Sequence, residues 1–522
     1  MKTYKITFLI AMMLTGLPFW ASSQGVNNGG FITGGTGSYI SLNGSNFVIQ
    51  SPNTGQFTID NLVIEKDAAL NENSFLTVTS SLIMNDTLTL KATSSGNASL
   101  ITNGSVSGTG SVQQYLAADQ WHMISSMVAG ALSGVYTGAY LYDWNETDST
   151  FSWISIVTHS LNTGEGYFAY SSTAISSPTT FTFDGTFNTG DVSPTLSYTS
   201  GLGKGDGWNL CGNPYPSSIR WDGTWTTANL DATVYVWDGA AGNYVNYNYN
   251  TGLGALTNGD IMPGQGFWVK ANAASPSMTI PNSKRLHTTN SFLKAGANKK
   301  DVLEITINGK KGSDYCVMKF DAAGTSAFNP LYDAYKLDGR PEAPEIYFLK
   351  ENQRTSSGYF PALTDDYTVR LGCYGGEGGE TTITFSIPES FDNEEIMVYL
   401  LDNKTGIHTL LNKTPSYTFN ADKNSFDEDR FKIVFTKTSL HTENLENRSN
   451  VKIYACGNDV YLTNGSATPL NVTFYLSTGQ QLAKMKVEPY SSTIQKINLH
   501  NQPVIIRAFT EENVVTKKLF IR

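Results

Sequence analysis

The stretch FTIDNLVIEKDAALNENSFLTVTSSLIMNDTLTL, from Phe57 to Leu90, decides the fold. Its apolar residues come in short runs, and Asn, Asp and Ser separate the runs. Strands are expected at 57–59, 62–64, 75–78, 82–84 and 88–90. The gaps between these runs are too short for helices. We therefore expect residues 24–115 to form a β-solenoid-like stalk whose rungs bury their apolar side chains against one another, with a short β-sandwich as the alternative.

Composition extends this interpretation to the whole chain. The 522 residues include 48 Gly, 27 Tyr and 26 Phe, and aromatic residues make up 12% of the total. Charged residues are only 15%, against about 25% in an average globular protein. Aromatic strand faces joined by polar turns account for this mixture, whereas a disordered chain has few aromatics. The composition predicts an all-β fold, and the length favours several domains.

The charge of the chain excludes one class of partner. The net charge is −10, and a protein that binds nucleic acid needs a basic surface to displace counterions. The charge is also uneven, because residues 451–522 carry eight Lys or Arg and four Asp or Glu, a net of +4. This basic C-terminal segment is compatible with a role separate from that of the acidic remainder.

The first residues are typical of a secretory signal. Two lysines precede a mostly apolar run, Ile6–Trp20, and small residues follow it. We expect residues 1–23 to be a signal peptide that is cleaved after Ser23, so that Gln24 becomes the first residue. The alternative is an uncleaved anchor, although the apolar run is short for a transmembrane helix.

An internal repeat follows the stalk. The first copy contains WHMISS from Trp121, AYLYD from Ala139 and GEGYFAY from Gly164, and the second contains WNLCGN from Trp208, VYVWD from Val234 and GQGFWVK from Gly264. The three offsets are 87, 95 and 100 residues, so the order is kept while loop insertions widen the spacing. These blocks predict a duplicated β-domain over residues 116–285, with copies at 116–195 and 196–285.

Two further β-units are expected after the repeat. Residues 298–438 contain about seven strand-like runs, the number expected of an Ig-like β-sandwich: 302–307, 315–320, 367–371, 381–387, 395–401, 416–419 and 431–435. Residues 439–450 are polar and lack periodicity, so they are interpreted as a linker. Residues 451–522 predict a small β-sandwich with strands at 451–454, 459–462, 471–475, 481–487, 492–497, 504–509 and 514–521.

The last 72 residues carry a recognisable pattern. VKIYACGNDVYLTN begins at Val451, TFYLSTGQQLAKMKV begins at Thr473, and PVIIRAFTEENVVTKKLFIR ends the chain. This segment resembles the C-terminal sorting domain of the type IX secretion system, with Gly479 at the hairpin position and Lys517 and Lys518 before the final strand. It departs from the family pattern at Pro503–Ile505, where Gly-Val-Tyr is usual.

The resemblance implies an export route and a source. Proteins with this domain come from Gram-negative bacteria of the Bacteroidetes type, and the outer-membrane translocon of the system recognises the domain. The domain is commonly cleaved, and the mature protein is released or attached to lipopolysaccharide. The resemblance therefore implies a secreted or cell-surface protein that has the type IX translocon as a partner.

No catalytic constellation stands out in the sequence. The six histidines are scattered at 122, 159, 287, 408, 441 and 500, and neither H-E-x-x-H nor G-x-S-x-G occurs. The four cysteines lack a C-x-x-C motif; Cys316 and Cys373 fall in one domain and could pair, although isolated buried thiols are favoured. Thr87 and Ser149 lie in short Asp-Ser/Thr motifs that resemble O-glycosylation sites of this bacterial group. No enzyme activity, metal or cofactor is expected.

Binding is the positive option that the sequence offers. Trp221, Trp225, Tyr244, Tyr247 and Tyr249 lie in segments rich in Asn and Gly, and exposed rings of this kind stack on sugars. Burial of the same rings in a core is the competing interpretation. The leading hypothesis is a non-enzymatic adhesive or structural protein that contacts glycan or extracellular matrix. A carbohydrate-binding module for nutrient capture and an unrecognised secreted hydrolase are the alternatives.

Overall fold

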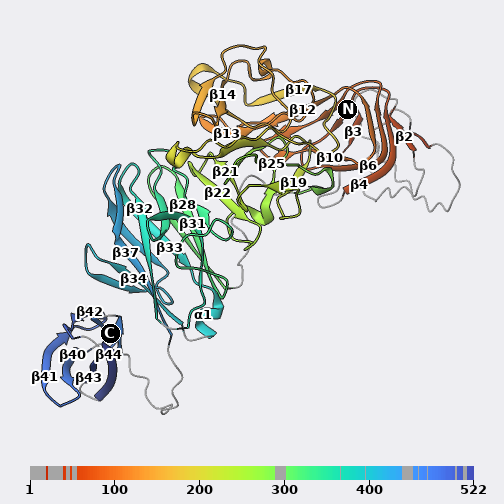
Figure 1. Cartoon of the computed structure of the whole chain (residues 1–522). Helices are drawn as coiled ribbons and strands as arrows, with labels where there is room; N and C mark the ends of the chain where they lie inside the picture. The colour runs from red at the N-terminus through yellow and green to blue at the C-terminus, as the bar shows by residue number, and fades with distance from the viewer. Residues whose placement is uncertain are drawn as a thin grey trace, which may run out of the picture.

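The computed structural model describes residues 19–21, 39–42, 47–49, 56–288, 301–437 and 451–521, except 365, 394–395, 457, 467, 500–501 and 510–513. Figure 1 shows strands gathered into successive modules, from the N-terminal solenoid in red to a separate C-terminal module in blue. The helices in these ranges are short: α1 (Glu389–Asn393) and the 3-10 helices η1 (Ser133–Tyr136), η2 (Thr173–Ile175), η3 (Gly203–Gly205), η4 (Thr257–Gly259) and η5 (Asn282–Lys284). The predicted all-β, multi-domain fold is confirmed.

The N-terminal module is a β-solenoid with two parallel sheets. Corresponding residues of successive rungs stack in register, so that Leu62 lies opposite Leu82, and Leu70 lies opposite Leu90. All four side chains are buried in one core. The first sheet contains β1 (Phe19–Ala21), β2 (Tyr39–Leu42), β4 (Gln56–Ile64), β6 (Phe75–Met84), β10 (Ser99–Thr102) and β11 (Ser105–Gly108), and the second contains β3 (Phe47–Ile49), β5 (Ala68–Leu70), β7 (Leu88–Leu90) and β12 (Gly110–Tyr115).

Two features mark the ends of the solenoid. Strand β1 belongs to the segment that the sequence assigns to a signal peptide, and it pairs in parallel with β2. At the other end, β17 (Thr180–Gly185) from the first repeat copy pairs antiparallel with β12 and extends the second sheet. The first copy therefore shares a core with the solenoid, which includes Phe181 and Phe183 of β17. A short hairpin of β8 (Ala92–Thr93) and β9 (Gly96–Asn97) lies beside it.

The duplicated domain consists of two four-stranded sheets with the same strand order. The first sheet runs β13 (Gln120–Ile124), β16 (Tyr167–Ser171), β14 (Tyr140–Asn145) and β15 (Thr150–Trp153), and the second runs β18 (Trp208–Gly212), β24 (Gly266–Lys270), β21 (Thr233–Asp238) and β22 (Asn243–Asn248). Two small sheets accompany the second copy: a three-stranded sheet of β23 (Asp260–Ile261), β19 (Ser218–Arg220) and β26 (Arg285–Leu286), and a pair of β20 (Thr227–Ala228) and β25 (Ser277–Met278). The repeat read from the sequence is therefore present in the fold.

The structure corrects the alignment of the middle repeat block. Tyr142 pairs with Phe168 in the first copy, whereas Tyr235 pairs with Trp268 in the second. The counterpart of Tyr142 is therefore Tyr235, which lies 93 residues later instead of the 95 that the sequence blocks gave. A shift of two residues keeps every side chain on the same face of a strand, so an alternating pattern does not reveal it.

The two sheets of the duplicated domain pack through aromatic side chains. Trp144 of the first copy meets Trp268 of the second edge to face, with ring centroids 5.0 Å apart. The indole N–H of Trp144 also donates to the backbone oxygen of Trp208 over 2.7 Å. Equivalent pairs within the copies have matching geometry: Trp121 and Tyr142 lie 5.5 Å apart at 72°, and Trp208 and Tyr235 lie 5.2 Å apart at 73°. The duplication thus extends to the orientation of side chains.

The predicted sandwich forms from one continuous sheet of eleven strands that folds over a single core. Phe419 and Phe431 pack across this core with centroids 5.0 Å apart, although their strands are not neighbours in the sheet. The strands are β27 (Val302–Asn308), β28 (Ser313–Asp321), β29 (Ala334–Tyr335), β30 (Glu345–Lys350), β31 (Gln353–Pro361), β32 (Tyr367–Tyr374), β33 (Gly379–Ser386), β34 (Ile396–Asp402), β35 (Ile407–Leu410), β36 (Ser416–Ala421) and β37 (Phe426–Lys437). The seven expected strands are present, and β29, β30, β31 and β35 are additional.

The C-terminal module contains the seven strands expected from the sequence. They form two sheets around their own core: β38 (Val451–Cys456), β39 (Asp459–Asn464) and β42 (Ser491–Lys496) in one, and β40 (Leu470–Leu476), β41 (Gln481–Val487), β43 (Gln502–Phe509) and β44 (Val514–Ile521) in the other. Contact with the preceding sandwich includes a small cluster of aromatic and aliphatic side chains. Tyr399 stacks near Tyr454, and His408 lies near Tyr461, each pair with centroids 5.1 Å apart.

Candidate functional site

The two tryptophans expected to bind sugar lie in a core. Trp221 is 1% exposed and Trp225 is 6% exposed. The indole N–H of Trp221 donates to the Ala232 oxygen over 2.9 Å, and that of Trp225 donates to the Arg220 oxygen over 2.8 Å. Their polar atoms are satisfied inside the protein and their faces are covered. The expected binding role of these two residues is therefore wrong.

The three tyrosines of the same prediction do not form a common surface. Tyr244 packs on Trp237 in the cluster between the two repeat sheets, whereas Tyr247 packs on the core of the second copy. The two residues are three apart on β22, so their side chains point to opposite faces of the sheet. Tyr249 lies beyond the strand and contacts the ring of Trp221. All three are partly buried, and the predicted sugar platform does not form.

Two histidines of the described residues, His122 and His287, serve as structural hydrogen-bonding groups. His122 is largely buried, and its Nε2 lies 3.0 Å from the Ala117 oxygen; burial lowers its pKa. His287 is held between Ser99 and Thr77, at 2.7 and 3.0 Å. Burial lowers the pKa of His287 to about 4. Ser99 is only 4% exposed, so this Ser–His pair offers no route to a substrate.

Three of the four cysteines are also unsuited to catalysis. Cys211, Cys316 and Cys373 are buried free thiols, which confirms isolated thiols over a pair between Cys316 and Cys373. Burial raises the pKa of all three, in the case of Cys373 to about 12, so the reactive thiolate is disfavoured. Within the ranges that the structure describes, no group of three or more His, Cys, Asp or Glu side chains is arranged to hold a metal ion.

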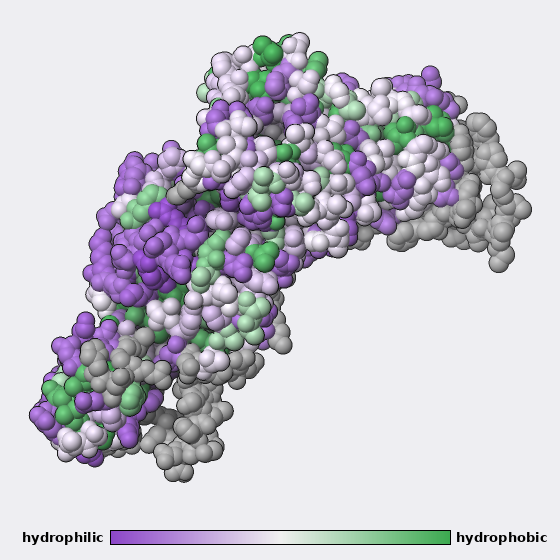
Figure 2. Space-filling model, in the orientation of Figure 1, coloured by the Kyte–Doolittle hydropathy of each residue, from purple (hydrophilic) through white to green (hydrophobic). Residues whose placement is uncertain are grey.

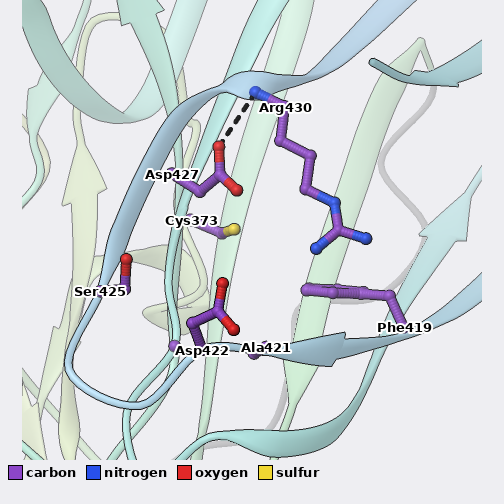
Figure 3. A pocket seen from close by; sticks show the side chains of 8 residues that line it. Cys373, Phe419, Ala421, Asp422, Ser425, Asp427 and Arg430 are labelled. Carbon is purple, nitrogen blue, oxygen red and sulfur yellow. Dashed lines mark hydrogen bonds between the residues drawn. The ribbon is translucent and has the colours of Figure 1, made fainter. Parts of the chain in front are cut away.

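A small pocket opens in the sandwich module beside Cys373 and Arg430 (Figure 3). The guanidinium of Arg430 lies over the ring of Phe419, 4.5 Å from its centroid. The same group binds both carboxylate oxygens of Asp402, over 3.1 and 2.8 Å. Asp427 accepts a hydrogen bond from the backbone N–H of Arg430, and Asp422 forms an ion pair with Lys404. The polar groups of the pocket are engaged in holding the fold.

An aromatic surface that sequence reasoning missed lies on the first repeat copy. One face of the β13–β16–β14–β15 sheet packs on the second copy at one end and is left open at the other. Five aromatic rings lie on the open end of this face. We call this surface the first-copy aromatic face. Its members are Trp121, Tyr140, Tyr142, Trp153 and Tyr170, and none of them is buried.

The second copy shows why this surface is open. There, the counterparts of Trp121 and Tyr142 are Trp208 and Tyr235, which are 7% and 1% exposed. Tyr335 of the sandwich module covers them, with its ring 6.2 Å from that of Trp208. A signal was present in the sequence, because the first copy has aromatic residues where the second has polar ones. The three pairs are Tyr140 and Thr233, Trp153 and Asn246, and Tyr170 and Lys270.

The residues singled out in the C-terminal segment lie on its surface. Gly479 is in the turn between β40 and β41 with φ at 89°, a left-handed conformation that favours glycine, and its N–H donates to the Leu476 oxygen. Lys517 and Lys518 are exposed on β44. Ser23 and Gln24, the expected cleavage site of the signal peptide, lie outside the described residues. Among the residues described, no helix is long and apolar enough to cross a membrane.

Comparison with known proteins places the chain in a family without a described activity. No curated protein matches it. Solved structures match with low similarity: a β-glucuronidase of Ruminococcus gnavus (13% identity, TM-score 0.11, 28% of this chain and 35% of that one) and a biofilm associated protein BSP domain (6%, TM-score 0.15, 79% and 92%). TM-scores this low carry no argument about activity, and the chain spans about a third of the glucuronidase's length. A family model described as "Domain of unknown function (DUF8693)" matches residues 36–435, and this chain therefore belongs to that family.

Proposed function

We propose that this chain is a non-enzymatic secreted or cell-surface protein with an adhesive or structural role, exported by a type IX secretion system. The observation that carries the proposal is the arrangement of the modules. A solenoid, a duplicated domain and a sandwich follow one another, and a separate small sandwich comes last (Figure 1). Such a chain of β-modules is suited to presenting a surface at a distance from an attachment point.

Hydrogen bonds across the junction between the duplicated domain and the sandwich support a structural role. The amide of Asn246 donates to Ser356 over 2.8 Å and accepts from Ser357 over 2.7 Å. Asn246 also donates its backbone N–H to the hydroxyl oxygen of Tyr315 over 2.9 Å. Buried polar groups that are satisfied only by a neighbouring module hold the two modules in a single orientation. The two modules are therefore expected to act as one rigid body.

The C-terminal module has features that fit an address for export. It has its own core, carries a net charge of +4 within an acidic chain and follows a polar linker. Its contact with the sandwich includes a small apolar cluster around Tyr399 and Tyr454, beside which Lys452 approaches the sulfur of Met397. A basic, accessible module at the end of the chain is well placed for recognition by the translocon, and attachment to anionic lipopolysaccharide is the proposed mode of anchoring.

The experiment compares the full chain with one lacking residues 451–522, each expressed in a bacterium with a type IX system. Surface exposure is measured by protease treatment of intact cells, and adhesion by retention of cells on immobilised polysaccharide and matrix protein. The full chain is expected at the surface or in the medium with raised adhesion, and the truncated chain is expected in the periplasm. Equal surface levels of the two chains would refute the export route. If cells with the full chain adhere no more strongly than cells without it, the adhesive role is refuted.

A further inference from the structure

The first-copy aromatic face has an internal counterpart that shows what such a surface accepts. In the second copy, the ring of Tyr335 covers Trp208, and the backbone N–H of Tyr335 donates to the hydroxyl oxygen of Tyr235 over 2.8 Å. The occupant is thus one flat six-membered ring with a hydrogen-bond donor beside it. In the first copy the same Trp and Tyr pair lies in the same orientation, and within the described part of the chain its ring contacts include no tyrosine of the sandwich module.

The open face is wider and more aromatic than its covered counterpart. Trp153 at the sheet edge is 62% exposed, and Tyr140 is 38% exposed. Tyr170 lies with its ring centroid 5.1 Å from that of Trp121 and 6.3 Å from that of Tyr140. Figure 2 shows scattered hydrophobic residues among neutral ones on the lobe that carries β14, and a broad hydrophilic area on part of the visible face of the sandwich module. Rings on four neighbouring strands therefore line one surface.

Polar groups border these rings. Asp119 lies at the end of the strand that carries Tyr170, because its backbone N–H donates to the Ser171 oxygen over 2.7 Å and its carboxylate accepts from Thr173 over 2.6 Å. Burial raises the pKa of Tyr170, Asp119 adds to the rise, and Arg340 of the sandwich module opposes it. The two charges have opposite sign, which gives the border no strong preference for a charged ligand. Trp and Tyr also combine an apolar face with a polar tip. This mixture matches the apolar faces and hydroxyl groups of pyranose rings.

We propose that the first-copy aromatic face binds a neutral glycan by stacking sugar rings on Trp153, Tyr140 and their neighbours. The inference deepens the adhesive role proposed above and rests on it. The size of the surface favours a glycan over a protein partner. Five partly covered rings offer a few hundred Å², below the roughly 800 Å² per partner that a stable protein interface buries.

The test measures binding of the purified full chain to cellohexaose, chitohexaose, mannohexaose and hexagalacturonate by titration calorimetry and tryptophan fluorescence. At least one neutral hexasaccharide is expected to bind. Trp153→Ala and Tyr140→Ala are expected to weaken that binding about tenfold or more, since loss of one central contact commonly costs that much. Trp153→Phe keeps a ring and is expected to stay within about threefold. Tyr490→Ala, which removes a 75% exposed ring from the C-terminal module, is the matched control and should change nothing.

Several outcomes would overturn the inference. The first is that none of the neutral hexasaccharides binds. The second is that Trp153→Ala leaves their binding unchanged, and the third is that only hexagalacturonate binds. Concentration-dependent self-association that Trp153→Ala abolishes, seen by analytical ultracentrifugation, would assign the face to a second copy instead. If cells that display the Trp153→Ala chain adhere as strongly as cells that display the wild-type chain, the glycan site is refuted and the adhesive role still stands. If neither chain raises adhesion, the adhesive role itself is refuted.

Discussion

The backbone N–H of Tyr335 donates to the hydroxyl oxygen of Tyr235 over 2.8 Å, and this bond joins the sandwich module to the second repeat copy. The same contact buries Tyr235 to 1% exposure. In the first copy, Tyr142 holds the equivalent position and remains partly exposed. This contact between residues 100 positions apart is one of several that form the junction, and the first copy, which has no such cover over Tyr142, keeps an open face.

Tyr315→Phe should weaken the junction between the modules. The Tyr315 hydroxyl oxygen accepts hydrogen bonds from the backbone N–H groups of Asn246 and Ala255, over 2.9 and 3.0 Å. The substitution leaves both buried donors unpaired, so the free energy of unfolding should fall by about 1–3 kcal/mol or more. Denaturant unfolding measures this change, and Tyr490→Phe on an exposed tyrosine is the control. Equal stability of the two variants would contradict the proposed role of Tyr315.

Lys350→Met should destabilise the sandwich module strongly. Both side chains of the Lys350–Asp333 pair are 0% exposed, and the ammonium lies 2.8 and 2.9 Å from the two carboxylate oxygens. Removing the cation leaves a buried carboxylate without its partner, which costs about 3–5 kcal/mol. The matched control is Lys423→Met in the exposed pair with Glu377, where about 0–1 kcal/mol is expected. Thermal unfolding of both variants gives the comparison, and losses of equal size would count against the buried pair.

His287 should make the protein less stable in mild acid. Its pKa falls from 6.5 to about 4 in the folded state, chiefly because of burial and also because of Arg285. The folded state therefore binds its proton less readily than the unfolded state, so stability present above pH 6.5 is lost as the pH falls toward 4. His287→Gln keeps hydrogen-bonding groups near Thr77 and Ser99 but does not titrate. Denaturation at a series of pH values should show a shallower decline for this variant, and parallel curves would exclude His287 as a contributor.

The contact between the last two modules should be separable without unfolding either. The ring centroids of Tyr454 and Tyr461 lie 4.9 Å apart in a stacked arrangement, and both rings pack against the sandwich near Tyr399. Tyr454→Ala with Tyr461→Ala removes this cluster, while the core of the C-terminal module remains. Small-angle X-ray scattering should then show a larger radius of gyration with little change in circular dichroism. An unchanged radius would mean that other contacts hold the module.

The sequence predicted the strands better than it predicted which rings are covered. The solenoid was readable because apolar runs such as Leu62–Ile64 and Leu82–Met84 recur at rung spacing and stack in register. Exposure was not readable for Trp221 and Trp153, because both end the same apolar–polar–aromatic alternation, Ile219–Arg220–Trp221 and Phe151–Ser152–Trp153. Trp221 is covered by its own module and Trp153 lies at an open sheet edge. Alternation indicates the face of a strand, whereas long-range packing decides whether that face is covered.

The additional strands of the sandwich were not predicted for a similar reason. Glu345–Lys350 and Gln353–Pro361 form two full strands, β30 and β31. Every residue of β30 is buried, including the charged Glu345 and Lys350 at its two ends, so charges lie where burial predicts apolar residues. Partners distant in sequence, Lys336 for Glu345 and Asp333 for Lys350, satisfy these charges. Such pairings become visible only when the fold brings the partners together.

The most direct measurement of the central claim transfers the C-terminal module to another protein. A periplasmic reporter that carries its own signal peptide is fused to residues 439–522 and expressed in a bacterium with a type IX system. The account predicts that the reporter appears at the cell surface or in the medium, and that a strain without the translocon retains it in the periplasm. A reporter that stays in the periplasm of the competent strain would contradict the account.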